Sequence, residues 1–319
     1  MNVNLQSIQD TGFEGAEQQS IFNAFRITLQ SPLDVPAKTA QIADELSFRY
    51  AALGSPSSLE DCLWETWVVL VEIVSIIPPD HEWQGILVNA IKLIREKNLG
   101  ANGGGPNDKA QLKELAGLPD YIRDAWFDPT DPVENIPTDF EPEDYHDDGD
   151  DDPAEPEEAE QIEPEEDDFA GPEEDPIQRY FKWKNLNSFV ARLTSEQYNP
   201  WFNLPIWQLR TALEYAPIRG AAMDTRIWVA SEWILQCGKL VFEQMTSGNE
   251  LDEESAAILE TGTLSTTDKA LSLERWQFWR DRFLFLSGSG SDLDLDAAVV
   301  QRARLAAQKM DGIRVGNSI

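Results

Sequence analysis

Apolar residues recur at helical spacing wherever the chain shows a clear pattern. After Pro36, the apolar positions from Ile42 to Leu53 follow one face of a helix. Residues 57–77, SSLEDCLWETWVVLVEIVSII, are apolar on nearly every face, which predicts a helix enclosed by others. The β-branched residues of this segment leave a buried strand as the alternative, although its length favours a helix.

The clearest amphipathic pattern follows two consecutive prolines. Residues 83–94 place Trp, Ile, Leu and Ala on one face, and Asp80 is positioned to cap the start of the helix that they predict. A further helix is predicted after Asp108, with apolar residues from Leu112 to Trp126 on one face.

Helical spacing resumes in the last part of the chain, where three helices are predicted at 183–193, 205–216 and 219–245. The helix at 219–245 is apolar on most faces, so we expect it to be central. The next helix places Trp276 and Trp279 on a repeating face, and a final helix after Ser291 is expected to be peripheral. Alternation typical of strands does not compete with this pattern, so we predict an all-α, multi-helix domain.

Residues 128–176 depart from the helical pattern. They hold 24 of the 58 acidic residues, nine of the 19 prolines and no Lys or Arg. Such a segment buries too little apolar surface to offset the entropy of ordering it. We therefore predict a long disordered acidic linker between an N-terminal helical half, 1–127, and a C-terminal helical half, 177–319. We expect the halves to pack as one domain around Trp67, Trp207, Trp228 and Trp233.

The formal net charge of −33 at pH 7 disfavours generic binding to nucleic acid and favours a basic protein partner. Cys62 and Cys237 both lie in apolar helical patterns, which is typical of buried free thiols in a reducing compartment. The first residues have neither a signal pattern nor a transit pattern. The longest apolar run, Cys62 to Ile77, is too short for a membrane span. We expect a protein that does not enter membranes, located in the cytoplasm or the nucleus.

Cofactor and metal signals are weak. The chain has two histidines, of which His146 lies in the acidic segment and His81 lies in PPDHEW, where helix capping is the favoured role. The glycine-rich string GANGGGPND lacks the Lys and the Ser or Thr of a phosphate-binding loop. We therefore expect no bound cofactor and no metal site.

Three carboxylates interrupt apolar helices and are the candidate catalytic residues, namely Glu65, Glu72 and Glu232. Burial raises the pKa of a carboxyl group that has no partner, which suits it to acid or base catalysis. The favoured interpretation is an ion pair that fixes the register of packed helices, with Arg226 or Arg275 as the basic partner.

Four blocks of the chain resemble a known family: NLNSFVARL, AAMDTRIWVASEWILQCGKLVF, LERWQFWRDRF and PPDHEWQGILVNAIKLI. Together they are similar to a fungal family of helical proteins labelled only as a domain of unknown function. The resemblance covers most of both halves and leaves out the acidic segment. It implies an all-α intracellular fold, and it brings no activity and no catalytic residues.

Three functions remain open. The favoured one is a noncatalytic helical module that binds another protein. The first alternative is a small-molecule enzyme or binder whose cavity is built on the buried carboxylates. The second is an acidic chaperone or nucleic-acid mimic whose residues 128–176 engage basic proteins. A tightly packed Glu232 paired with an arginine would favour the interaction module, and a polar cavity beside Glu232 would favour the enzyme.

Overall fold

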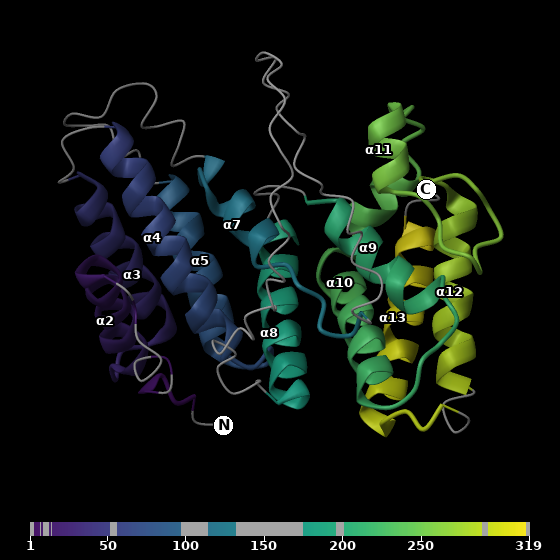
Figure 1. The fold of residues 1–319 in the computed structure, drawn as a ribbon, viewed down its shortest axis with the longest axis horizontal. Coiled ribbons are helices and arrows are strands. Elements are labelled where there is room, and N and C mark those ends of the chain that lie inside the picture. Colours follow the sequence, from purple (N-terminus) through teal and green to yellow (C-terminus); the bar gives the residue numbers. More distant parts are fainter. Residues whose placement is uncertain are drawn as a thin grey trace, which may run out of the picture.

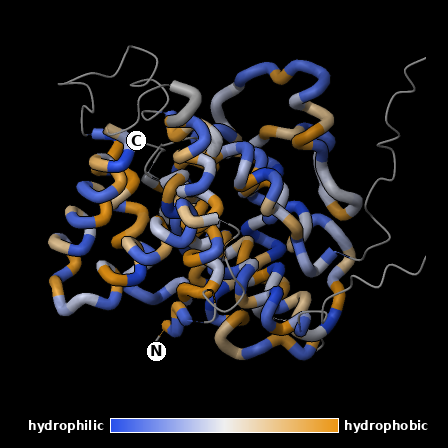
Figure 2. The backbone as a smooth tube through the Cα atoms, turned by 60° about the vertical axis from the view of Figure 1, so that its left-hand side comes forward, coloured by the Kyte–Doolittle hydropathy of each residue, from blue (hydrophilic) through white to orange (hydrophobic). Residues whose placement is uncertain are grey.

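The computed structural model is helical throughout the part of the chain that it describes, and this confirms the predicted all-α class (Figure 1). The described residues are 3–6, 8, 13, 15–51, 56–96, 114–131, 175–195, 201–288 and 293–316. Within these ranges there are eleven helices and no strand. Apolar and polar residues are interspersed along most of these helices, as expected for helices that each bury one face (Figure 2).

Five helices make up the N-terminal half: α2 (Ala16–Gln30), α3 (Val35–Ala51), α4 (Pro56–Ser75), α5 (Glu82–Glu96) and α7 (Leu118–Asp124). Helix α3 packs against α2 and α5, while α4 packs against α2 and α7. Helix α4 confirms the predicted helix and excludes the strand alternative, but Asp61, Trp64 and Glu72 are exposed on one face, so the expected enclosure on all sides is wrong. Helix α5 buries the apolar face that its sequence predicted.

Six helices make up the C-terminal half: α8 (Pro176–Ser195), α9 (Asn203–Leu213), α10 (Ala221–Met245), α11 (Glu253–Ile258), α12 (Leu273–Gly288) and α13 (Ala297–Gly316). Helix α10 contacts α8, α9, α12 and α13, which confirms its predicted central position. Helix α13 packs one face against α10 and α12, and most of its residues are exposed, as expected of a peripheral helix.

Helix α8 lies between the two groups of helices and bonds to the N-terminal one (Figure 1). The Asn185 side-chain amide donates to the carbonyl of Ser75 at 2.7 Å. Gln84 Nε2 of α5 in turn donates to the carbonyl of Asn185 at 3.2 Å. These amides satisfy carbonyl groups where a helix ends or packs closely, and they fix α8 against α4 and α5.

Limited proteolysis tests whether the two halves are one domain. We expect a protease to cut between residues 140 and 170 while the two fragments elute together from a sizing column, because the contacts of α8 bury apolar surface from both halves. Fragments that separate and each keep their helical circular dichroism would show two independent domains instead.

Two of the four predicted core tryptophans are central. Trp67 and Trp233 are 1% and 0% exposed. Trp207 and Trp228 are only half-buried, which corrects their predicted place in the core. The Arg302 guanidinium covers one face of the Trp228 ring, at 4.2 Å from the ring centroid. A charged group of this kind keeps contact with water, so Trp228 lies at the edge of the core.

The helix predicted after Asp108 is not continuous to Trp126 in the structure, because a turn at residues 115–117 precedes α7, which begins at Leu118. Leu115 and Gly117 have φ values of 54° and 79°, in the left-handed region that ends a right-handed helical run. The turn is held by Trp67, whose indole N–H donates to the carbonyl of Ala116 at 2.8 Å. Residues 97–113 lie outside the described residues.

Most of the predicted disordered segment, residues 132–174, also lies outside the described residues. The chain just before it is folded. Asp128 Oδ1 accepts hydrogen bonds from the backbone N–H and the hydroxyl of Thr130, at 2.9 and 2.7 Å. Arg226 of α10 donates to Thr130 Oγ1 and to Asp131 Oδ1, both at 2.9 Å. The folded part therefore extends to Asp131, and burial raises the pKa of the Asp128 carboxyl.

Both cysteines are buried free thiols, as predicted. Burial raises the pKa of Cys62 to about 11 and raises the pKa of Cys237 further. Neither side chain is therefore a thiolate at neutral pH, so neither is a reactive nucleophile.

Candidate functional site

The structure does not bring the three candidate carboxylates together. Glu65 and Glu72 lie on α4 and Glu232 lies on α10, with α8 between these helices (Figure 1). Glu72 is exposed, because its face of α4 is not covered, so the expected burial is wrong for this residue. Glu65 is half-buried and accepts a hydrogen bond from Gln18 Nε2 at 2.5 Å. Only Glu232, which is 2% exposed, is enclosed.

Both carboxylate oxygens of Glu232 are bonded. Oε1 accepts from the hydroxyl of Ser188 at 2.7 Å and from Gln236 Nε2 at 2.9 Å. Oε2 accepts from Nη2 of Arg302 in an ion pair. The four side chains come from α8, α10 and α13, so this cluster joins three helices.

The ion pair of Glu232 is confirmed, but its predicted basic partner is wrong. Arg226 is bound to the chain at Thr130, and Arg275 is bound to another carboxylate, as described below. The partner is Arg302 of α13, the helix that was expected to be peripheral.

A second arginine lies at the edge of the Glu232 cluster. Arg192 Nε donates to Ser188 Oγ at 3.4 Å, and Ser188 is the residue that donates to Glu232. Burial lowers the pKa of both Arg192 and Arg302, and the carboxylate of Asp80 partly offsets this in each case. The positive charges of the two arginines are therefore balanced by the carboxylates of Glu232 and Asp80 in this part of the protein.

The most deeply buried acid is Glu214, which the sequence did not indicate. It follows α9 and is 0% exposed. Its Oε1 accepts from Arg275 Nε at 2.6 Å and from the indole of Trp279 at 2.5 Å. Its Oε2 accepts from Arg275 Nη2 at 3.1 Å and from the backbone N–H of Gly262 at 2.6 Å. A Cβ at Gly262 would lie 2.7 Å from Glu214 Cβ, so only glycine fits there.

Arg275 uses all five of its N–H donors. Two bind Glu214, and the other three bind the carbonyls of Leu259, Glu260 and Ala270 at 2.7, 2.9 and 2.7 Å. The guanidinium thus holds the connection between α11 and α12 against α9. We assign this cluster a structural role, since it has no free donor or acceptor for a ligand.

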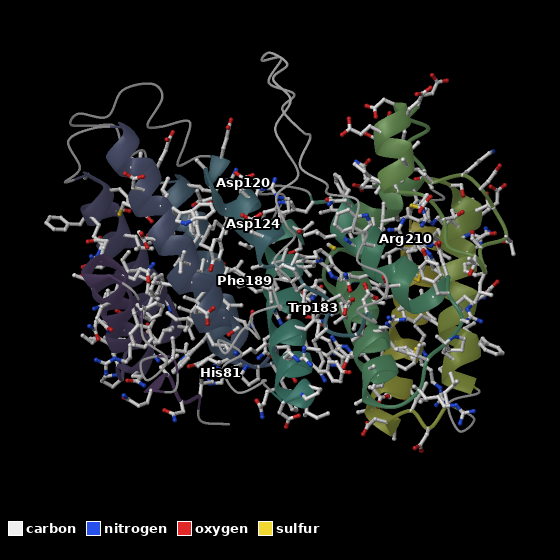
Figure 3. The ribbon with its side chains drawn as sticks, viewed as in Figure 1. His81, Asp120, Asp124, Trp183, Phe189 and Arg210 are labelled. Atoms are coloured by element: carbon white, nitrogen blue, oxygen red, sulfur yellow. The ribbon has the colours of Figure 1, made fainter. Side chains whose placement is uncertain are left out.

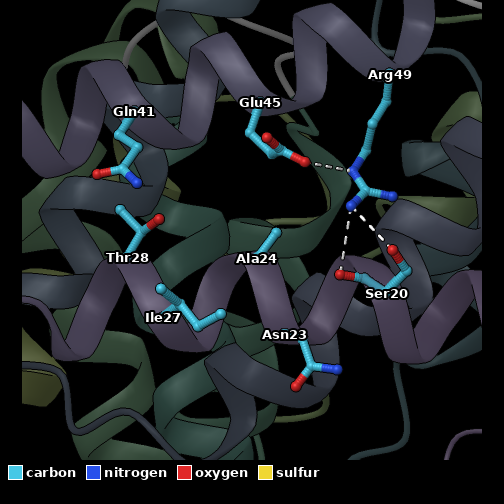
Figure 4. Close-up of a pocket in the computed structure, with 8 residues that line it drawn as sticks. All are labelled: Ser20, Asn23, Ala24, Ile27, Thr28, Gln41, Glu45 and Arg49. Atoms are coloured by element: carbon cyan, nitrogen blue, oxygen red, sulfur yellow. Dashed lines mark hydrogen bonds and ion pairs between the residues drawn. The ribbon is translucent and has the colours of Figure 1, made fainter.

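A groove of about 300 Å³ lies open to solvent between α2 and α3 (Figure 4). It is lined by Ser20, Asn23, Ala24, Ile27 and Thr28 of α2 and by Gln41, Glu45 and Arg49 of α3. Arg49 spans the groove, with Nε donating to Glu45 Oε1 and Nη2 donating to Ser20 Oγ, both at 3.0 Å. The groove lies away from the Glu232 and Glu214 clusters, on two helices at one end of the molecule (Figure 1).

A family model described as "Protein of unknown function (DUF3632)" matches residues 67–283, which is more than half of the chain. The chain belongs to this family. The match confirms the resemblance to a family labelled as a domain of unknown function. No curated protein and no solved structure matches the chain.

The DUF3632 match divides the sites described above. It contains Glu232, Glu214 and Arg275, whereas α2, α3 and α13 lie outside it. The groove between α2 and α3 and the Arg302 partner of Glu232 therefore lie outside the matched region. None of the helices that the structure describes in this DUF3632 protein combines the length and apolar character of a membrane span.

His81 takes part in helix capping, which was its favoured role. Its Nδ1 accepts from the backbone N–H of Trp83 at 3.3 Å, and burial lowers the pKa of the imidazole. His81 lies at the opposite end of the molecule from the acidic residues Asp120 and Asp124 (Figure 3). Across the described ranges, no three His, Cys, Asp or Glu side chains gather as they would to hold a metal ion.

Proposed function

We propose that this protein is a noncatalytic helical module that binds another protein. The observation that carries the proposal is the environment of Glu232, the candidate carboxylate with the greatest burial. Its two oxygens are bonded to Ser188, Gln236 and Arg302, and the residue is 2% exposed.

This environment does not suit acid or base catalysis. A general acid or base must reach a substrate atom and exchange a proton with it. Glu232 is covered by three helices, and its charge is matched by Arg302 in the folded protein. Glu214 is enclosed in the same way by Arg275 and Trp279. Both carboxylates therefore fix helices in place, which supports a binding role for the outer surface.

Charge supports a basic partner. A formal net charge of −33 attracts cationic proteins and speeds their association. The two buried free thiols support a reducing compartment, and we place the protein in the cytoplasm or the nucleus.

Affinity capture from cell extract tests the proposal, with the full chain and a chain lacking residues 140–170 as paired baits. We expect a partner that both baits retain and that forms a complex again when the two purified proteins are mixed. A partner held only by the full chain would favour the acidic chaperone or nucleic-acid mimic. Failure to capture a partner, together with a metabolite that raises the Tm of the wild type but not of Glu232→Gln, would favour the small-molecule alternative.

A further inference from the structure

We propose that the groove between α2 and α3 binds a basic, amphipathic helix of the partner protein. The proposal rests on the proposed function and names the surface and the chemistry of its partner. It draws on the shape of the groove, on two exposed apolar side chains and on the charges around them.

The shape of the groove suits a helix. On α2 the lining residues are three and four positions apart, and on α3 they are four apart, so each set occupies one face of its helix. The groove therefore runs along the helix axes. The lining residues of α2 run from Ser20 to Thr28, about 12 Å along the helix, which accommodates about two turns of a third helix. Packing an amphipathic helix between two others is a common mode of recognition.

Two large apolar side chains are exposed at the groove or next to it, one on each helix. Ile27 of α2 lines the groove and is 59% exposed. Phe48 of α3 is 74% exposed and lies seven residues after Gln41, hence on the same face as this lining residue. Single exposed apolar residues are common on any protein, but two that border one groove provide anchors for an apolar helix face.

Asn23 of α2 and Gln41 of α3 are both lining residues, and their side-chain amides give the groove a polar component (Figure 4). Such groups pair with polar side chains at the edge of a bound helix, and so they would set its orientation.

The exposed charge around the groove is acidic. Glu17 and Glu45 have side chains 54% and 42% exposed, and Asp44 is exposed one turn before Phe48. The cations nearest to the groove are bonded within the protein. Arg49 pairs with Glu17 and Glu45, and Arg26 of α2 donates to Asn23 Oδ1 at 3.1 Å. Lys38, whose side chain is 9% exposed, donates to a backbone carbonyl. A helix with Lys or Arg beside its apolar face therefore complements this surface.

The test uses a fluorescent synthetic helix of about 15 residues, built from Leu and Lys with Leu on one face. Binding is measured by fluorescence anisotropy at low and moderate salt with the full chain. We expect Ile27→Asp combined with Phe48→Asp to weaken binding at least tenfold. The matched control is Phe127→Asp, because Phe127 is 78% exposed and lies after α7, outside both helices of the groove, and it should leave binding unchanged. All replaced side chains are exposed, and circular dichroism verifies that each variant is folded.

Several results would overturn the proposal. Equal binding of the peptide by the groove variant and by the wild type would show attraction to an acidic protein without a site. Equal binding of a peptide with Glu in place of Lys would remove the requirement for a basic helix. A dimer in sedimentation experiments that the groove variant abolishes would assign the groove to a second copy of the chain.

Repeating the affinity capture with the groove variant separates this proposal from the proposed function. A partner captured by the wild type and lost by the groove variant supports both. A partner retained by the groove variant leaves the interaction module standing and overturns the groove. If the wild type captures no partner, the proposed function fails, whereas the peptide experiment still decides whether the groove binds a basic helix.

Discussion

Replacement of Arg275 by Met should lower the free energy of unfolding by about 3–5 kcal/mol, because it leaves the Glu214 carboxylate buried without its countercharge. Both residues are 0% exposed, so water cannot take over the lost contacts. The carbonyls of Leu259, Glu260 and Ala270 also lose their donor. Urea unfolding followed by circular dichroism measures this loss.

A neighbouring arginine provides the control for this prediction. Arg280 lies on the same helix, has a side chain 35% exposed and pairs with Asp281 and Asp311. We expect Arg280→Met to cost less than about 1 kcal/mol, as is usual for exposed pairs. An equally small loss for Arg275→Met would contradict the structural role of the Glu214 cluster. Adding Glu214→Gln to Arg275→Met should recover part of the loss, which measures the coupling of the pair.

Helices whose apolar face is long and regular were predictable from the sequence. The stripe at 83–94 became α5, and the nearly all-round apolar segment at 219–245 became the central α10. In both cases the burial of a continuous face dominates the energetics, so local periodicity is sufficient evidence. Helix α2 could have been predicted on the same basis, because Ile21, Phe25 and Leu29 are spaced four residues apart and all are buried.

The sequence also contains a signal for the turn that precedes α7, although this signal is not an apolar pattern. Gly117 is followed by Leu118 and Pro119, and a glycine near a proline commonly marks a turn followed by a new helix start. The apolar spacing continued through this point and so predicted one helix. The backbone freedom of Gly117, at a φ of 79°, decided the outcome.

The ion-pair partners could not be predicted, because they depend on how distant helices pack. Arg275 follows Glu214 by 61 residues and Arg302 follows Glu232 by 70. Charge and helical phase allow many pairings over such separations. The position of α12 against α9 selects Arg275 for Glu214, and the position of α13 against α10 selects Arg302 for Glu232. Of the three candidate carboxylates, only Glu232 has the buried, arginine-paired environment that the sequence predicted.

Replacement of Glu232 by Gln should lower the free energy of unfolding by about 2–3 kcal/mol, less than the loss at Arg275, because the Arg302 side chain is 21% exposed and remains partly solvated. A glutamine still accepts from Ser188 but no longer balances the charge of Arg302, whose Nε already lacks a partner among the described residues. Thermal and urea unfolding of the two proteins measure the effect. Glu65→Gln is the control, since this half-buried carboxylate is bonded to an uncharged Gln18, and its loss should be below about 1 kcal/mol.

The double variant Glu232→Gln with Arg192→Gln separates charge balance from packing. Removing Arg192 relieves its repulsion with Arg302, so the double variant should lose less stability than the two single losses added together. Strict additivity would show that the two arginines act independently of Glu232. A Tm that stays unchanged or rises in Glu232→Gln would mean that the carboxylate is held at a cost to stability, as functional groups often are. That result would contradict the interaction module and favour the small-molecule alternative.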